Sequence, residues 1–107
     1  MIEYELCDLG IDYPDYFQGF GVAFTRYNNC AVGVGMTKRE ALDDCLEQIE
    51  QTGTNSATIE SQIIADENWH SLDDCPNDPL PDDCQTIADS DEYSDAQYYV
   101  GIRWIDS

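Results

Sequence analysis

Carboxylates are the side chains that give this sequence its chemistry. The chain holds 23 Asp and Glu residues against four Lys and Arg residues, for a formal net charge of −19 over 107 residues. Carboxylates can ligate metals, transfer protons or attract cationic partners, and their spacing decides among these roles. Sixteen of these acids fall into two groups, and their spacing favours the third role.

The first group of acids lies at helical spacing between positions 40 and 50. Neighbours three or four residues apart on a helix are roughly 5–6 Å apart, which approximates the separation of phosphates along a nucleic-acid strand. Each like-charged pair costs about 0.2–0.5 kcal/mol, and only Lys38 and Arg39 lie near. We therefore expect this face to bind a cationic partner, the alternative being an ordinary solvated face. Its members are Glu40, Asp43, Asp44, Glu47 and Glu50.

The second group lies in residues 66–95, which hold eleven acids and no Lys or Arg. From about residue 70 to 96 this segment has three prolines and few large apolar residues, so we expect a long acidic loop with little regular structure. We expect it to share the binding role of the first group. Its acids are Asp66, Glu67, Asp73, Asp74, Asp78, Asp82, Asp83, Asp89, Asp91, Glu92 and Asp95.

The partner that suits this charge is a basic protein surface. A polyanion is repelled by nucleic acid and by anionic lipid, so we expect neither to bind directly. Most basic protein surfaces hold DNA or RNA. No apolar run is long enough to span a bilayer, and the first residues lack the basic and apolar parts of a signal peptide, so we expect a cytoplasmic protein.

Catalytic and metal-binding patterns are weak. The single His70 has no obvious catalytic partner, and neither a nucleophile motif nor a phosphate-binding glycine loop is present, so we expect no enzyme activity and no cofactor. His70, Cys75 and Cys84 lack the close Cys pair of a structural zinc site. Five scattered cysteines favour reduced thiols, several of them in the core, although Cys75 and Cys84 could pair under oxidising conditions.

Strand patterns occupy the first third of the chain. Residues 2–7 alternate apolar and polar side chains, residues 10–15 are rich in turn formers, and residues 17–27 and 30–36 read as strands joined by Asn28-Asn29 in a hairpin. Glycines recur at spacing two at 19, 21, 33 and 35. One face of the hairpin thus has little side-chain bulk, and we expect another element to pack closely on it.

Helix patterns follow. Thr37 and Glu40 form a capping box, apolar residues from Ala41 to Ile49 follow helical spacing, and Gly53 is a stop signal. A second helix is predicted from Asn55 or Ser56 to about Trp69.

Residues 98–105 predict a final strand, with Tyr98, Val100, Ile102 and Trp104 on its core face. The element order β-β-β-α-α-loop-β predicts one α+β domain over residues 1–107: an antiparallel sheet of about four strands with two helices on one face.

In its overall profile the chain resembles small acidic inhibitors from phages and mobile elements, which include anti-CRISPR and anti-restriction DNA mimics. This resemblance lies in composition and covers the whole chain. It implies a stoichiometric inhibitor of a nucleic-acid-binding host defence complex, acting in the host cytoplasm.

A local resemblance runs from Gly21 to Gly53, where a hairpin leads into Thr37-Lys38-Arg39-Glu40-Ala41-Leu42. It is similar to the HicB-like antitoxin domain, in which a hairpin precedes a T-x-x-E-A-L helix, and it implies neutralisation of a basic RNase toxin. The chain departs from that family in having no DNA-binding segment after the domain.

Adaptation to high salt is a third reading, since 15 Asp, 8 Glu and one Lys also suit a halophilic cytoplasm.

Overall fold

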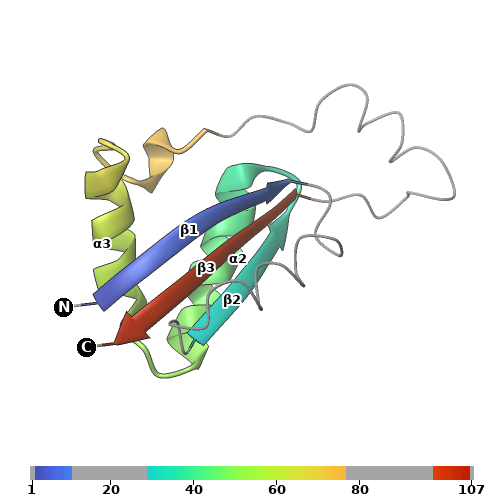
Figure 1. Cartoon of the computed structure of the whole chain (residues 1–107). Helices are drawn as coiled ribbons and strands as arrows, with labels where there is room; N and C mark the ends of the chain where they lie inside the picture. Colours follow the sequence, from blue (N-terminus) through green and yellow to red (C-terminus); the bar gives the residue numbers. More distant parts are fainter. Residues whose placement is uncertain (1, 11–28, 77–97, 107) are drawn as a thin grey trace, which may run out of the picture.

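The computed structural model describes residues 2–10, 29–76 and 98–106 (Figure 1). Within these ranges it contains three strands, two α-helices and one short 3-10 helix. They are β1 (Ile2–Gly10), β2 (Asn29–Gly35), α2 (Lys38–Gln51), α3 (Ser56–Asp66), η1 (Leu72–Asp74) and β3 (Tyr98–Asp106).

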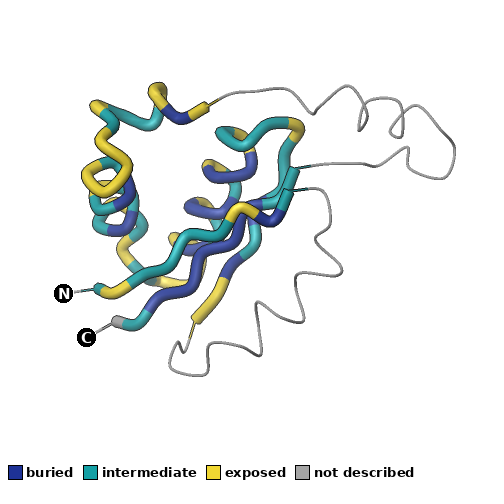
Figure 2. The backbone as a smooth tube through the Cα atoms, turned by 45° about the horizontal axis from the view of Figure 1, so that its top comes forward, coloured by how far each residue is buried: buried dark blue, intermediate teal, exposed yellow. Residues whose placement is uncertain are grey.

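The three described strands form an antiparallel sheet in the order β1-β3-β2, so the last strand of the chain lies in the centre. In the register, Ile102 lies opposite Leu6 of β1 and Ala31 of β2. Figure 2 shows α2 and α3 on the same side of the strands. The predicted α+β class is confirmed. The predicted strand 17–27, and with it the fourth strand and the hairpin, lies outside the described residues.

The core lies between the sheet and the two helices. Val100, Ile102 and Trp104 are 0, 0 and 1% exposed, and Tyr98 packs against them, which confirms the predicted core face of β3. Residues of β1 at the predicted alternation, Ile2, Tyr4 and Leu6, border the same core. Because β1 and β3 alternate in register, each presents its apolar residues to the helices.

Helix α2 begins and ends as its sequence predicts. The Thr37 hydroxyl accepts a hydrogen bond from the Glu40 amide at 3.2 Å, and the Glu40 carboxylate accepts one from the Met36 amide at 2.9 Å. Glu40 thus reaches one residue further back than in the usual capping box. Gly53 follows the helix with φ of +89°, a conformation that glycine adopts without steric cost.

The close packing predicted for the glycine-rich strand is seen at Gly33 and Gly35. A Cβ on Gly33 would lie 1.9 Å from the Ala41 carbonyl oxygen, and one on Gly35 would lie 2.5 Å from Cβ of Glu40. Both distances are too short for real atoms, so α2 can lie on β2 only where the strand has no side chains. Gly19 and Gly21 lie outside the described residues.

The segment after α3 differs from its prediction. The helix ends at Asp66 instead of near Trp69, because Asn68 turns the chain with φ of +60°. Residues 70–76, the start of the segment predicted to be a loop with little regular structure, include the three-residue helix η1. Trp69 and Leu72 pack against the core and Cys75 is 1% exposed, and this burial holds the segment against the helices. Of the helices described, none is long and apolar enough to cross a membrane.

Candidate acidic surface

Four carboxylates form a line along the exposed side of α2, and we call Glu40, Asp43, Glu47 and Glu50 the acidic stripe. All four residues are exposed. Their spacings of three, four and three residues place them within roughly 80° of helix circumference and along about 15 Å of its axis. Opposite them, Ala41, Leu42, Cys45, Leu46 and Ile49 are buried. The stripe therefore faces away from the sheet.

Asp44, the fifth acid predicted on this helix, lies apart from the stripe. Its carboxylate accepts hydrogen bonds from the Val34 amide at 2.9 Å and from the Gln48 side chain at 3.0 Å. Gln48 also donates to the Val32 carbonyl at 2.9 Å. Asp44 and Gln48 thus hold α2 to β2, a role that the sequence analysis did not foresee for either.

A second set of exposed acids lies where α3 ends and η1 begins, and we call Asp66, Glu67, Asp73 and Asp74 the acidic corner. Asp66 accepts a hydrogen bond from the Tyr4 hydroxyl, and Asp74 accepts one from the His70 amide at 2.7 Å. Burial, and then the hydrogen bond to Asp66, raises the pKa of Tyr4, so this phenol stays protonated as the donor.

Arg39 joins the corner to the helix that carries the stripe. Its guanidinium Nη2 donates to the carbonyl oxygens of Asp73 at 2.6 Å and Cys75 at 3.0 Å. A guanidinium can hold two backbone acceptors in a fixed geometry. The sequence analysis treated Arg39 only as a nearby charge, but in the structure it positions η1.

Cys75 marks the point where the two acidic sets approach each other. Burial raises the pKa of its thiol, Lys38 and Arg39 lower it, and Asp43 of the stripe and Glu67 of the corner raise it again. Charges of both signs, from two cations and two carboxylates, therefore act on this one buried thiol.

Among the described residues, Arg103 is the cation on the sheet face away from the helices. This side chain is 3% exposed; its Nη2 lies 3.3 Å from the Glu5 carboxylate and 3.2 Å from the Cys7 sulfur. Among the described residues the structure records one ion pair, between Arg103 and Glu5. No carboxylate of the stripe or the corner forms an ion pair with a described residue. In the described part of the chain, Lys38 and Arg39 are the cations near these acids, and neither forms an ion pair with them.

Seven predicted binding residues lie outside the described residues, and the structure gives no account of them: Asp78, Asp82, Asp83, Asp89, Asp91, Glu92 and Asp95. Cys84 lies there as well, so the zinc pattern is not tested; Cys75 itself is a free thiol in the structure. His70 is exposed. Within the described ranges no group of three or more His, Cys, Asp or Glu side chains is placed to hold a metal ion.

Comparison with known proteins adds nothing to this description, because no family model, curated protein or solved structure matches the chain.

Proposed function

We propose that this protein binds a basic, nucleic-acid-contacting surface of another protein and blocks access of DNA or RNA by competition. The observation that carries the proposal is the acidic stripe, four exposed carboxylates in one line on α2, none of which forms an ion pair with another described residue. The acidic corner extends this charge beyond the helix. A host defence complex of the kind that anti-CRISPR or anti-restriction proteins block would supply such a surface.

The spacing of the stripe supports competition with nucleic acid. Successive members lie about one helical turn apart, so like charges repel and each pair destabilises the helix by about 0.2–0.5 kcal/mol. A basic groove relieves this repulsion when it binds. The same groove releases counterions on binding phosphates, so both ligands draw on one electrostatic source of affinity.

The first test is capture of partners by the tagged protein from a cell lysate, followed by elution with increasing salt. We expect a nucleic-acid-binding protein or complex that elutes as salt rises, because screening weakens contacts between exposed charges. Adding the protein to the purified partner should then release bound DNA or RNA in proportion to the protein added. Simultaneous binding of both ligands would contradict the proposal.

Two matched charge reversals locate the contact. Glu47→Lys changes the stripe, and Glu60→Lys makes the same change of two charges on α3, outside the stripe. We expect Glu47→Lys to weaken partner binding about tenfold or more, since it places like charges together at the interface, and Glu60→Lys to weaken it far less. Equal effects would mean that net charge alone drives binding. Asp44 is left unchanged because its carboxylate contacts β2.

The same capture separates the other two readings. Recovery of a basic ribonuclease would favour the HicB-like antitoxin. Recovery of no specific partner, together with a fold that needs molar salt, would favour an acidic domain adapted to a halophilic cytoplasm.

A further inference from the structure

The two edges of the described sheet differ in what covers them. At the outer edge of β2, Asp44 accepts from the Val34 amide and Gln48 donates to the Val32 carbonyl, at 2.9 Å each. A neighbouring strand would place a carbonyl and an amide at these two points. Side chains of α2 therefore close the β2 edge at Val32 and Val34.

The alternation of an antiparallel ladder identifies the groups at the other edge. The backbone N–H and C=O groups of Val32 and Val34 point away from β3, so those of Gly33 point toward it and pair with Val100. In β3 the alternation then directs the backbone groups of Gly101 and Arg103 toward β1. Their partners are Cys7 and Glu5. The backbone groups of Tyr4 and Leu6 therefore point to the outer edge of β1.

One contact and one absence of contacts agree with this assignment. The Ile2 carbonyl, which shares the alternation of Tyr4 and Leu6, accepts from the Gln62 side chain of α3 at 3.1 Å. Apart from the β1–β3 ladder, no hydrogen bond within the described ranges uses the backbone of Tyr4 or Leu6. An edge whose backbone groups have no partner among the described residues is a template for an added strand.

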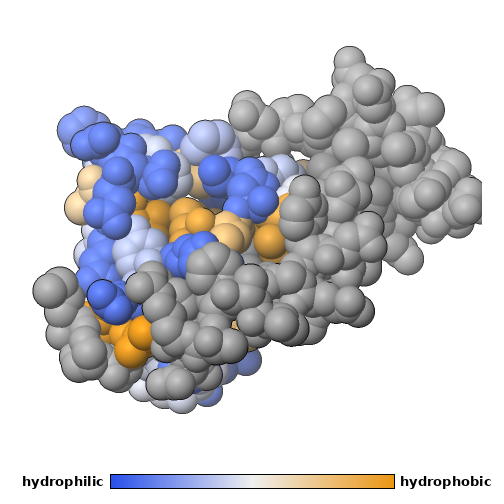
Figure 3. All heavy atoms as spheres, viewed as in Figure 1, coloured by the Kyte–Doolittle hydropathy of each residue, from blue (hydrophilic) through white to orange (hydrophobic). Residues whose placement is uncertain are grey.

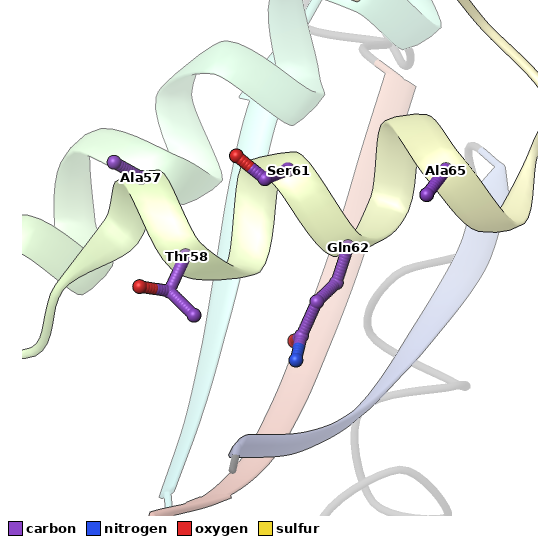
Figure 4. Close-up of a pocket in the computed structure, with 5 residues that line it drawn as sticks. All are labelled: Ala57, Thr58, Ser61, Gln62 and Ala65. Atoms are coloured by element: carbon purple, nitrogen blue, oxygen red, sulfur yellow. The ribbon is translucent and has the colours of Figure 1, made fainter.

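The flank of α3 beside this edge is hollow. Ala57, Thr58, Ser61, Gln62 and Ala65 line a shallow hollow of about 460 Å³, and Thr58 and Gln62 project from α3 toward the strands (Figure 4). Gln62 also bonds Ile2, so the hollow lies next to the β1 edge. Short side chains on an added strand could occupy it.

The charge near the edge is acidic. Glu3 is exposed on the sheet face away from the helices, and Asp66 contacts Tyr4, whereas Glu5, two residues on, is already paired with Arg103. In the part of that face that Figure 3 leaves uncovered, hydrophobic residues gather near the centre of the view and hydrophilic residues lie on the α3 side. A strand with basic side chains on one face and small apolar ones on the other would complement both.

We infer that the outer edge of β1, from Tyr4 to Asp8, binds an extended basic segment of the partner as an additional strand. Lys or Arg side chains of that segment alternate with small apolar ones: the basic side chains lie on the sheet face that carries Glu3, and the apolar ones face α3. The inference rests on the proposed function for the basic character of the partner and adds a second mode of contact. A second copy of β1 fits poorly because Glu3 and Glu5 would meet their own counterparts.

The probe is a seven-residue peptide of alternating lysine and valine, added to the isotopically labelled full chain. We expect amide hydrogen exchange at Tyr4 and Leu6 to slow about tenfold, with little change in β2. When the peptide pairs antiparallel to β1, with its valines opposite Tyr4 and Leu6, the valine amides face β1 and the lysine amides face solvent. N-methylation of the valines should therefore weaken binding about tenfold or more, and N-methylation of the lysines should not.

Equal affinity of the two N-methylated peptides would overturn the inference. Without peptide, protection of the Tyr4 and Leu6 amides that rises with protein concentration would also overturn it, because a second copy of the chain would then occupy the edge. Glu3→Lys should weaken peptide binding more than the matched Glu50→Lys change on α2; equal weakening would indicate attraction by net charge only.

The two proposals fail separately. Protection of Tyr4 and Leu6 by the peptide without capture of any nucleic-acid-binding partner would leave the edge site standing and reject the proposed function. Capture of such a partner that depends on Glu47 while the peptide leaves Tyr4 and Leu6 unprotected would do the reverse.

Discussion

Asp43 and Asp44 are neighbours in sequence, yet their carboxylates have different surroundings. Asp43 is exposed and makes no hydrogen bond within the described part of the chain, whereas Asp44 accepts from the Val34 amide and from Gln48. The first belongs to the surface that we propose for binding, and the second belongs to the packing of α2 on β2. Charge reversal at the two positions should therefore have different consequences.

Removal of the Asp44 carboxylate should destabilise the fold. Asp44→Ala leaves the Val34 amide without its acceptor, so we expect the free energy of unfolding to fall by about 1–3 kcal/mol in urea titrations. Asp44→Asn should cost less because its amide oxygen can still accept. The matched Asp43→Ala change should leave stability unchanged or raise it slightly, and a loss equal to that of Asp44→Ala would contradict this assignment.

Burial of the Cys45 thiol should make stability depend on pH above 9. Desolvation raises the pKa of Cys45 from 9.0 to about 12, so the folded chain keeps a proton that the unfolded chain loses. Stability is thus full below pH 9 and falls by up to about 1.4 kcal/mol per pH unit as pH rises toward 12.

The control for this pH dependence is Cys45→Ala, compared by slope and not by absolute stability. Urea titrations between pH 8 and pH 11 should show a shallower decline for the variant. The raised pKa of Tyr4 acts in the same direction in both proteins. Identical slopes would show that Cys45 does not contribute.

At the scale of elements, the packing of α2 on β2 depends on glycine. The sequence predicts this contact, because glycines at spacing two leave a strand face without side chains and the next segment is an amphipathic helix. Gly33→Ala should cost about 3 kcal/mol or more, since the new Cβ meets backbone atoms of Ala41 and Cys45 that cannot turn aside.

A matched change at the other end of α2 separates packing from backbone strain. Gly53→Ala adds the same methyl group where nothing lies within 4 Å, at φ of +89°, so we expect only about 1 kcal/mol. Thermal or urea unfolding of both variants measures the difference. A similar cost at both positions would mean that α2 can move away from β2.

Local patterns account for what the sequence could predict. Capping chemistry located α2, and period-two alternation located the core faces of β1 and β3. The order β1-β3-β2 and the roles of Asp44 and Arg39 depend on residues far apart in the chain, on which local spacing gives no information. The packing of residues 70–76 could not be predicted for the same reason, since polar composition indicates only a loop, while Arg39 and the burial of Cys75 hold them in place.

At the scale of the whole molecule, repulsion among the acids lowers the stability of the folded chain, while the same charge favours binding of a basic partner. A net charge of −19 repels itself in the folded chain, and salt screens that repulsion. The same salt also screens the attraction between the stripe and a basic partner. Stability and affinity should therefore respond to salt with opposite signs.

We expect the melting temperature to rise by about 5 °C or more between 10 mM and 0.5 M NaCl, while affinity for the captured partner falls over the same range. The Asp43→Lys, Glu47→Lys double variant has a net charge of −15, since each change removes one negative charge and adds one positive charge. Its melting temperature should rise less with salt, and its affinity should be low throughout. A melting temperature that does not change with salt concentration would mean that the exposed acids are too far apart to oppose folding. An affinity that does not change with salt concentration would remove the electrostatic basis of the proposed function.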